Sequence, residues 1–242
     1  MKGKVAVVTG AGRGIGQGIA TTLAARGVAV AVNDMHGDRC REVVEQIRAA
    51  GGTAAAFECD VTDLAAVEAM AAAVADELGP ADILVNNAGI PETFIPKKFR
   101  DSSPEDWDPF IRVNLYGVFH CVRAFADSMC ERSWGRIVTI SSEAWRTGTP
   151  MGISMYAAGK AGAIGFMRQL SAELGDEGVT VNCVALGEMS NIPLPESHWN
   201  RYPIKRAGTP DDVGSLVAFL ASDEASWITG QVVALNGGLV TS

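Results

Sequence analysis

Residues 5–16 read VAVVTGAGRGIG, and this stretch decides the fold. A short apolar strand runs into a turn with four glycines in seven positions, and a helical pattern follows. Glycines let the backbone approach a bound group closely. The amides at the start of the next helix face an anion, whose charge the helix dipole favours. The stretch therefore predicts a phosphate-binding turn between a strand and a helix, and a tight turn without a ligand is the alternative.

The same alternation of strand and helix continues to the end of the chain. Strands that are almost entirely apolar indicate burial on both faces, with the helices as covers. We therefore predict an α/β fold in which residues 1–242 form a single domain, a Rossmann-type doubly wound parallel sheet of about seven strands with helices on both faces. The expected strands are Val5–Val8, Val28–Val32, Ala54–Glu58, Ile83–Val85, Arg136–Ile140, Thr180–Val184 and Val232–Ala234. The expected helices are 15–26, 37–50, 63–78, 104–131, 154–175 and 211–221.

Composition narrows the range of partners. A net charge of −8 argues against nucleic acid and against an anionic membrane surface. The five cysteines contain no Cys-x-x-Cys pair, so we expect reduced thiols, no metal site and a cytoplasmic location. The N-terminus shows no signal-peptide pattern, and no apolar run is long enough for a membrane span. One stretch without clear periodicity, 187–207, contains three prolines and is the expected substrate lid.

The ends of the next strands carry polar residues that suit a dinucleotide. Asp34 follows the second strand, where a carboxylate accepts hydrogen bonds from the adenosine ribose. It would repel a 2′-phosphate by about 4 kcal/mol at about 4 Å, which Arg13 offsets only in part. Asp34 therefore favours NAD over NADP, and a helix cap is its alternative role. Asp60-Val61 and Asn87-Ala88-Gly89 end two further strands at the same edge of the sheet.

Tyr156 and Lys160 are the expected acid/base pair. Their spacing of four places both side chains on one face of a helix. A tyrosine titrates near pH 10, and a lysine ammonium beside it lowers that pKa. Ser142, at the end of a buried strand, is expected to donate to the substrate oxygen, with Ser141 as a rival. Asn114 is a polar residue in an apolar helical stretch, where it would bend the helix and hold a water; a satisfied buried amide is the alternative.

Taken in order, the motifs TGAGRGIG, Asp34, CDV, NNAG, Asn114, SS and Y-x-x-x-K resemble those of the short-chain dehydrogenase/reductase family. The resemblance spans nearly the whole chain and continues through VTVNCVALG, RAGTPDDV, FLASDEASWITGQ and NGG. It implies hydride transfer between a substrate carbon and C4 of a nicotinamide, without a metal, by a catalytic set of Asn114, Ser142, Tyr156 and Lys160. The cofactor residues that it implies are Gly10, Arg13, Gly14, Ile15, Gly16, Asp34, Asp60, Val61, Asn87, Ala88, Gly89, Tyr156, Lys160, Gly187 and Met189.

Three features depart from the family pattern. Residues 186–191 read LGEMSN where the family usually has P-G-x-x-x-T, so Asn191 replaces a threonine. The spacing from Ser142 to Tyr156 is one residue longer than the commonest one, which alters the loop 143–153. Asn236 stands where aspartate is usual, and we expect it to affect packing more than chemistry.

Bulky residues in the loops predict the substrate. They suit a hydrophobic or cyclic secondary alcohol or its ketone, with Arg146 as a possible partner for a substrate carboxylate. The expected pocket walls are Phe94, Glu143, Trp145, Met151, Met189 and Trp199.

Two alternatives stay open. A reductase of 3-oxoacyl thioesters would typically use NADPH, which Asp34 opposes, and Ala172 replaces an arginine common in such enzymes. A non-catalytic dinucleotide-binding protein would not need Tyr156 and Lys160. The family resemblance also implies a homo-oligomer built on the long helices and the last strand, with a tetramer favoured over a dimer.

Overall fold

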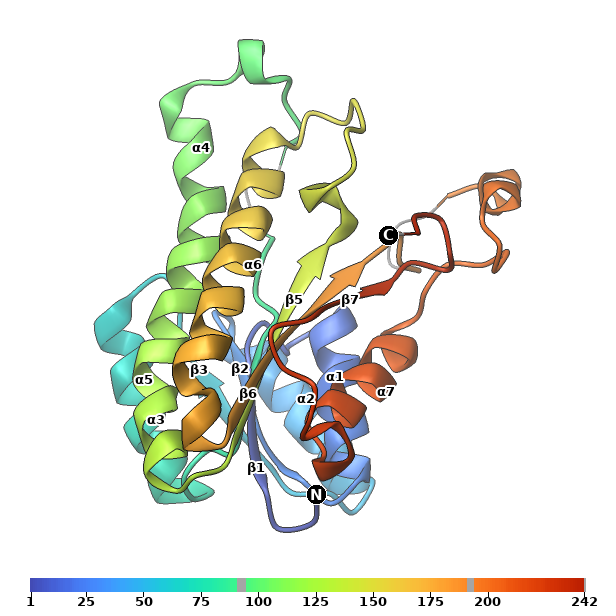
Figure 1. Ribbon diagram of the computed structural model, residues 1–242. Coiled ribbons are helices and arrows are strands. Elements are labelled where there is room, and N and C mark those ends of the chain that lie inside the picture. The colour runs from blue at the N-terminus through green and yellow to red at the C-terminus, as the bar shows by residue number, and fades with distance from the viewer. Residues whose placement is uncertain (91–94, 191–193, 242) are drawn as a thin grey trace.

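The computed structural model describes residues 1–90, 95–190 and 194–241. Its strands form one sheet of seven, all parallel, in the order β3-β2-β1-β4-β5-β6-β7 (Figure 1). The predicted parallel sheet is therefore confirmed. The strands are β1 (Val5–Val8), β2 (Ala29–Asp34), β3 (Ala54–Glu58), β4 (Ile83–Asn86), β5 (Gly135–Ser142), β6 (Val179–Leu186) and β7 (Val232–Leu235).

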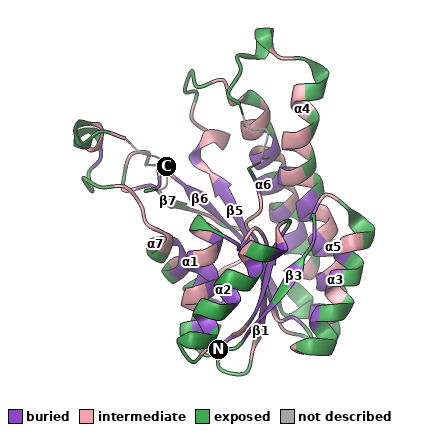
Figure 2. Cartoon of the chain, turned by 180° about the vertical axis from the view of Figure 1, so that it is seen from behind, coloured by how far each residue is buried: buried purple, intermediate pink, exposed green. Residues whose placement is uncertain are grey.

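Helices cover both faces of the sheet, as predicted. Buried residues of α1, α2 and α7 form one core with the sheet, and those of α3, α5 and α6 form the other (Figure 2). The inner strands are wholly buried between these layers, which explains their unbroken apolar runs. The helices are α1 (Gly14–Ala25), α2 (Gly37–Ala49), α3 (Leu64–Glu77), α4 (Pro104–Ile111), α5 (Gly117–Glu131), α6 (Ser154–Leu174) and α7 (Pro210–Leu220).

The segment 104–131, expected as one helix, is α4 and α5 joined by a π-helical turn, Arg112–Tyr116. Asn114 lies in this turn, and its side-chain amide donates to the carbonyl of Phe110 at 3.0 Å. A side chain that takes the carbonyl four residues back competes with the backbone ladder and distorts the helix. The sequence therefore identified the polar residue correctly but not the change of helix type.

Five strands, β2, β4, β5, β6 and β7, run further than predicted. Parallel pairing continues through Asp34↔Glu58 between β2 and β3, and through Ser142↔Leu186 between β5 and β6. The polar residues at these positions therefore belong to the strand ends themselves, where the ladder fixes their direction.

The strand order reverses between β1 and β4, since the chain winds outward from β1 to β3 and then returns to the other side. A crevice opens beyond the carboxyl ends of the strands at such a switch point. In the described part of the chain, no helix is both long and apolar enough to cross a membrane.

Candidate active site

Glycine is required at the turn after β1. Gly10 and Gly14 have φ angles of +60° and +57°, which side chains rarely adopt. A β-carbon on Gly16 would lie 2.2 Å from the carbonyl oxygen of Gly10. The side-chain amide of Asn87, beyond β4, donates to the carbonyls of Thr9 (2.9 Å) and Gly10 (3.0 Å). Asn87 therefore joins the glycine turn to the neighbouring strand.

The start of α1 fits the phosphates of a dinucleotide. Its N-cap, Arg13, is exposed and makes no side-chain cap, and the first turn holds no acidic residue. A β-carbon on Gly14 would have nothing within 4 Å, so the backbone faces open space. Uncapped amides at a helix N-terminus suit an anion. Ile15 is half-buried behind them.

Asp34 lies at the end of β2, 8% exposed, and its carboxylate is tied to the glycine turn. Its Oδ2 accepts from the Gly12 amide, and its Oδ1 from the His36 amide, both at 3.1 Å. The N-cap of α2 is His36, so Asp34 is not the helix cap that was its alternative role. Arg39 Nη1 lies 3.9 Å from Oδ1. The sequence analysis missed Arg39, because the contact depends on α2 crossing the glycine turn, where a Gly12 β-carbon would meet Arg39 Cβ at 2.6 Å.

The remaining predicted cofactor residues surround the same edge of the sheet. Asp60 is exposed, and its carboxylate accepts from the Thr62 amide at 2.9 Å, so one of its oxygens is used in the turn after β3. Val61 is buried beside it. Ala88 packs against the glycine turn, since a β-carbon on Gly10 would lie 2.9 Å from its Cα. On the other side of the switch point, the Gly187 amide donates to Leu235 at 3.0 Å, and Met189 is buried and bridges to Gly208.

Lys160 is 5% exposed, and its ammonium donates to the carbonyl of Ile140 on β5 at 2.7 Å. Burial lowers the pKa of Lys160 to about 8, an effect that nearby Cys183 partly opposes. Its Nζ lies 5.7 Å from the centre of the Tyr156 ring, so the predicted pair does meet on one face of α6. Burial raises the pKa of Tyr156, against a hydrogen bond with Ser142 that lowers it.

The two serines at the end of β5 differ. Successive side chains of a strand point to opposite faces. Ser142 is half-buried, accepts from the Ala144 amide at 3.2 Å, and lies close enough to Tyr156 to lower the pKa of that hydroxyl. Ser141 is 1% exposed, and its hydroxyl has no partner among the described residues. The hydroxyl that meets Tyr156 is therefore that of Ser142.

Gly89 brings β4 against both Asn114 and Lys160. A β-carbon on Gly89 would lie 2.7 Å from Lys160 Nζ and 2.8 Å from Asn114 Oδ1. Asn114 is 1% exposed, and its Oδ1 has no partner within the described residues. Three separate motifs thus converge at one point, where an acceptor without a partner faces an ammonium.

Glu143, one of the predicted walls of the substrate pocket, makes its contacts with other residues of the protein. Glu143 is 5% exposed; it binds Arg146 at 2.6 and 3.1 Å and accepts from Asn236 Nδ2 at 3.1 Å. Arg146 is therefore already paired with a carboxylate of its own chain. The contact also gives a reason for Asn236, since an aspartate there would place a second carboxylate against Glu143.

The other predicted walls differ in their burial and contacts. Trp145 is half-buried, and its indole nitrogen has no partner among the described residues. Met151 is 56% exposed. Trp199 packs against His198 and Tyr202. None of these residues lines the pocket beside Tyr156, and Phe94 and Asn191 lie outside the described residues.

A parallel sheet with a glycine turn at its switch point, and a half-buried tyrosine beside a buried lysine across from it, defines a dinucleotide-binding oxidoreductase. Comparisons with known proteins identify the family. A family profile described as Enoyl-(Acyl carrier protein) reductase matches residues 10–240. The chain belongs to the short-chain dehydrogenase/reductase family and is an oxidoreductase that acts on hydroxyl or keto groups.

Similar proteins cover the whole length of the chain. The (2S)-[(R)-hydroxy(phenyl)methyl]succinyl-CoA dehydrogenase subunit BbsD of Thauera aromatica is 38% identical, over 98% of this chain and 97% of the relative. The 3-oxoacyl-[acyl-carrier-protein] reductase FabG of Staphylococcus aureus is 39% identical, over 98% of each. A solved 7α-hydroxysteroid dehydrogenase, complexed with NADH and 7-oxo glycochenodeoxycholic acid, superimposes with a TM-score of 0.92 at 35% identity, covering 100% of this chain and 96% of the other.

Proposed function

We propose that the protein interconverts a secondary alcohol and its ketone, with NAD as the hydride carrier. The substrate is hydrophobic or cyclic. The observation that carries the choice of NAD is the buried carboxylate of Asp34 at the end of β2, bonded to the Gly12 amide of the glycine turn.

The chemistry at the substrate oxygen belongs to Tyr156, Ser142 and Lys160. Burial raises the pKa of Tyr156, so its hydroxyl is protonated at neutral pH and can donate to a ketone oxygen. In the reverse direction the Tyr156 phenolate, stabilised by the Lys160 ammonium, takes the proton of the alcohol and becomes the hydroxyl again. Ser142, which lies beside Tyr156, orients the substrate oxygen. A bound nicotinamide supplies or accepts the hydride at the substrate carbon.

The glycine turn and the end of β2 supply the groups that would hold the cofactor. The α1 amides and Arg13 would bind the phosphates, and Asp34 would accept from the adenosine ribose. Repulsion between Asp34 and a 2′-phosphate disfavours NADP, although Arg39 at 3.9 Å reduces that repulsion. We therefore expect a preference for NAD and not an absolute requirement.

Support for the substrate class comes from two relatives. The solved relative carries a steroid, and the Thauera aromatica relative is named for a phenyl-bearing hydroxy compound. The second candidate is a reductase of 3-oxoacyl thioesters that uses NADPH, which similarity to the Staphylococcus aureus reductase favours.

The segment 187–207 is the proposed cover of the substrate. Its described part is held by what we name the Glu188 cluster, formed by Glu188, His198, Arg201 and Tyr202. Glu188 accepts from the Tyr202 hydroxyl at 2.6 Å and from Arg201 at 2.8 Å, and it contacts His198. These contacts fix residues 198–202 beside the end of β6.

Assembly as a homotetramer is part of the proposal. Trp227 is 98% exposed and Phe219 38% exposed, and the edge strand β7 is only half-buried. Large apolar side chains left in water favour a covering partner. Native mass spectrometry measures the assembly directly, and a monomer would contradict this part. A cytoplasmic location is supported by the five cysteines, all of which are free.

One paired assay tests the proposal. Purified protein is given NAD or NADP with cyclic and aromatic secondary alcohols and with 3-hydroxyacyl thioesters, and the reduced nicotinamide is followed by absorbance. We expect turnover of the alcohols with a higher kcat/KM for NAD, and loss of turnover in Tyr156→Phe. Turnover with NADP confined to the thioesters would support the second candidate. No turnover in any combination would leave the non-catalytic alternative.

Variants of Asp34 test the choice of cofactor. Asp34→Ala should lower kcat/KM for NAD and raise it for NADP, while Asp38→Ala, which removes an exposed acid in the first turn of α2, should change neither. A wild-type protein that prefers NADP would contradict the role of Asp34.

A further inference from the structure

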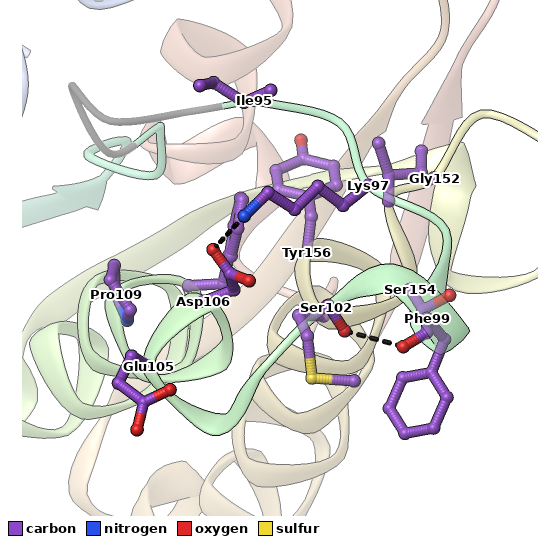
Figure 3. Close-up of a pocket in the computed structure, with 13 residues that line it drawn as sticks. Ile95, Lys97, Phe99, Ser102, Glu105, Asp106, Pro109, Gly152, Ser154 and Tyr156 are labelled. Carbon is purple, nitrogen blue, oxygen red and sulfur yellow. Dashed lines mark hydrogen bonds and ion pairs between the residues drawn. The ribbon is translucent and has the colours of Figure 1, made fainter.

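A pocket of about 350 Å³ opens between the N-terminal ends of α4 and α6 (Figure 3). None of the predicted wall residues that the structure describes lines this pocket, but Tyr156 does. The volume lies at the lower end of the range for small-molecule sites, which suits a fragment of a ligand. The other lining residues are Ile95, Lys97, Phe99, Ser102, Glu105, Asp106, Pro109, Phe110, Gly152, Ile153, Ser154 and Met155.

Two contacts hold the walls of this pocket in place. At one end the Lys97 amide donates to the carbonyl of Gly152 at 3.0 Å. Gly152 has a φ of +68°, and a β-carbon there would lie 2.8 Å from the Lys97 backbone, so the two loops touch only because this residue is glycine. At the other end α4 packs on α6 at Gly159, whose β-carbon would meet the Phe110 carbonyl at 3.1 Å. The space between these contacts is therefore formed before any ligand arrives.

The lining is chiefly apolar, with aromatic and branched side chains from the loop before α4, from α4 and from the start of α6. Ile95 is 68% exposed and Phe99 52% exposed, so apolar surface is left in water at this pocket. Covering it would stabilise a complex with an apolar group.

The charged groups disfavour an anionic ligand. Among the lining residues that the structure describes, Lys97 is the one cation, and it is paired with Asp106 at 2.6 Å. Asp106 is also bonded to the amide of Ser103 at 2.9 Å, in the capping box of α4. Glu105 then remains as an excess negative charge. An uncharged group is favoured over the phosphates that acyl carriers bear.

We propose that this pocket holds the part of the substrate remote from the reacting carbon, an uncharged apolar group such as a second ring. The inference rests on the proposed function, since it extends a substrate whose oxygen sits at the Tyr156 hydroxyl. Tyr156 forms a wall of the pocket and lies next to Ser142 in the candidate active site, so a substrate whose oxygen is at Tyr156 can extend into the pocket. The pocket therefore selects alcohols that carry an apolar extension.

The test compares two alcohols that differ by one ring, cyclohexanol and 4-phenylcyclohexanol, in steady-state assays with NAD. Two variants alter the pocket at exposed positions, Ser154→Trp, which fills it, and Ile95→Glu, which places a charge on its wall. The matched controls are Leu64→Trp and Leu64→Glu, at an exposed position on α3 outside the pocket.

In the wild type we expect kcat/KM for 4-phenylcyclohexanol to exceed that for cyclohexanol by at least tenfold. Ser154→Trp and Ile95→Glu should reduce this ratio at least tenfold and leave kcat/KM for cyclohexanol within twofold, while both Leu64 variants keep the wild-type ratio. A ratio that is unchanged in both pocket variants, in protein that remains folded by circular dichroism, overturns the inference while the proposed function stands.

If neither alcohol is oxidised, the proposed function is contradicted, and a binding experiment tests the pocket independently of turnover. Ligand-observed NMR with 4-phenylcyclohexanone then measures contact of the phenyl protons with the protein. Broadening of these resonances by the wild type but not by Ser154→Trp supports the pocket as a binding site. Equal broadening, or none, overturns it.

Discussion

Gly89 gives the sharpest test of how the three motifs meet. Its φ is not in the left-handed region, so alanine is compatible with the backbone, and the effect of Gly89→Ala comes from the added carbon alone. That carbon would lie 2.7 Å from Lys160 Nζ and 2.8 Å from Asn114 Oδ1, whereas ordinary contact begins near 3.4 Å. Lys160 must therefore retreat by the difference between 3.4 and 2.7 Å, about 0.7 Å.

This displacement is large on the scale of catalysis. Lys160 Nζ is held at 2.7 Å by the Ile140 carbonyl, so a shift of that size stretches or breaks the bond. Misplacement of a catalytic group by about 1 Å costs about 100-fold in rate, so we expect kcat to fall by about 10- to 100-fold. The weakened hydrogen bond to a charged group should also lower the free energy of unfolding by about 1 to 3 kcal/mol.

Steady-state kinetics and urea unfolding measure the two effects. The matched control is Gly165→Ala on α6, at an exposed position where a β-carbon would have nothing within 4 Å. Alanine in a helix stabilises by up to about 1 kcal/mol relative to glycine, so the control should unfold at higher urea with unchanged kcat. Wild-type kcat/KM in Gly89→Ala would refute the convergence of β4, Asn114 and Lys160 as a functional arrangement.

Three further predictions concern the same site and its cover. Tyr156→Phe should lower kcat by about 100-fold or more while NADH still binds, as measured by fluorescence titration; retained turnover would remove Tyr156 from its role. Burial lowers the pKa of Lys160 from 10.5 to about 8, so between these pH values the unfolded chain binds the proton that the folded protein has released, and stability rises with pH. In urea unfolding from pH 8 upward, the free energy of unfolding of the wild type should rise by up to about 3 kcal/mol, and that of Lys160→Met should lack this rise. Equal pH profiles of the two proteins would contradict the lowered pKa. Glu188→Ala leaves the buried Tyr202 hydroxyl without its acceptor and should cost about 1 to 3 kcal/mol in unfolding free energy, whereas Glu188→Gln, which keeps an acceptor oxygen, should cost less; equal losses would show that the hydrogen bond is not what matters.

Local patterns were sufficient for the elements of the fold. Strands buried between two helical layers must be apolar on both sides, so their positions are visible as short apolar runs between helical stretches. The errors lie at strand ends and in the helix around Asn114. Polar residues such as Asp34 and Ser142 look like loop residues, yet pairing with the next strand keeps them in the ladder.

The candidate site divides in the same way. The spacing of Tyr156 and Lys160 is a property of one helix, so the sequence predicts that they share a face. The ion pair of Asp34 with Arg39 depends on how α2 crosses the glycine turn, and no motif marks it. The substrate walls were the weakest prediction, because bulk and apolarity in a loop do not say which way a side chain points. Glu143 is an example, since it turns inward to Arg146 and Asn236.

By itself, then, the sequence determined the alternation of strands and helices that implies a parallel sheet, the glycine turn after β1 and the shared helix face of Tyr156 and Lys160, since each depends on residues close together in the chain. Only the tertiary structure decided which polar side chains bind one another and where a pocket opens to solvent. The contact of Glu143 with Asn236 joins residues 93 positions apart. The pocket beside Tyr156 lies where α4 packs on α6 at Gly159 and where two loops touch at Gly152, and both contacts require a residue without a side chain. Such contacts follow from the packing of α4 and α6 and from the order of β5, β6 and β7 in the sheet, which no local pattern encodes.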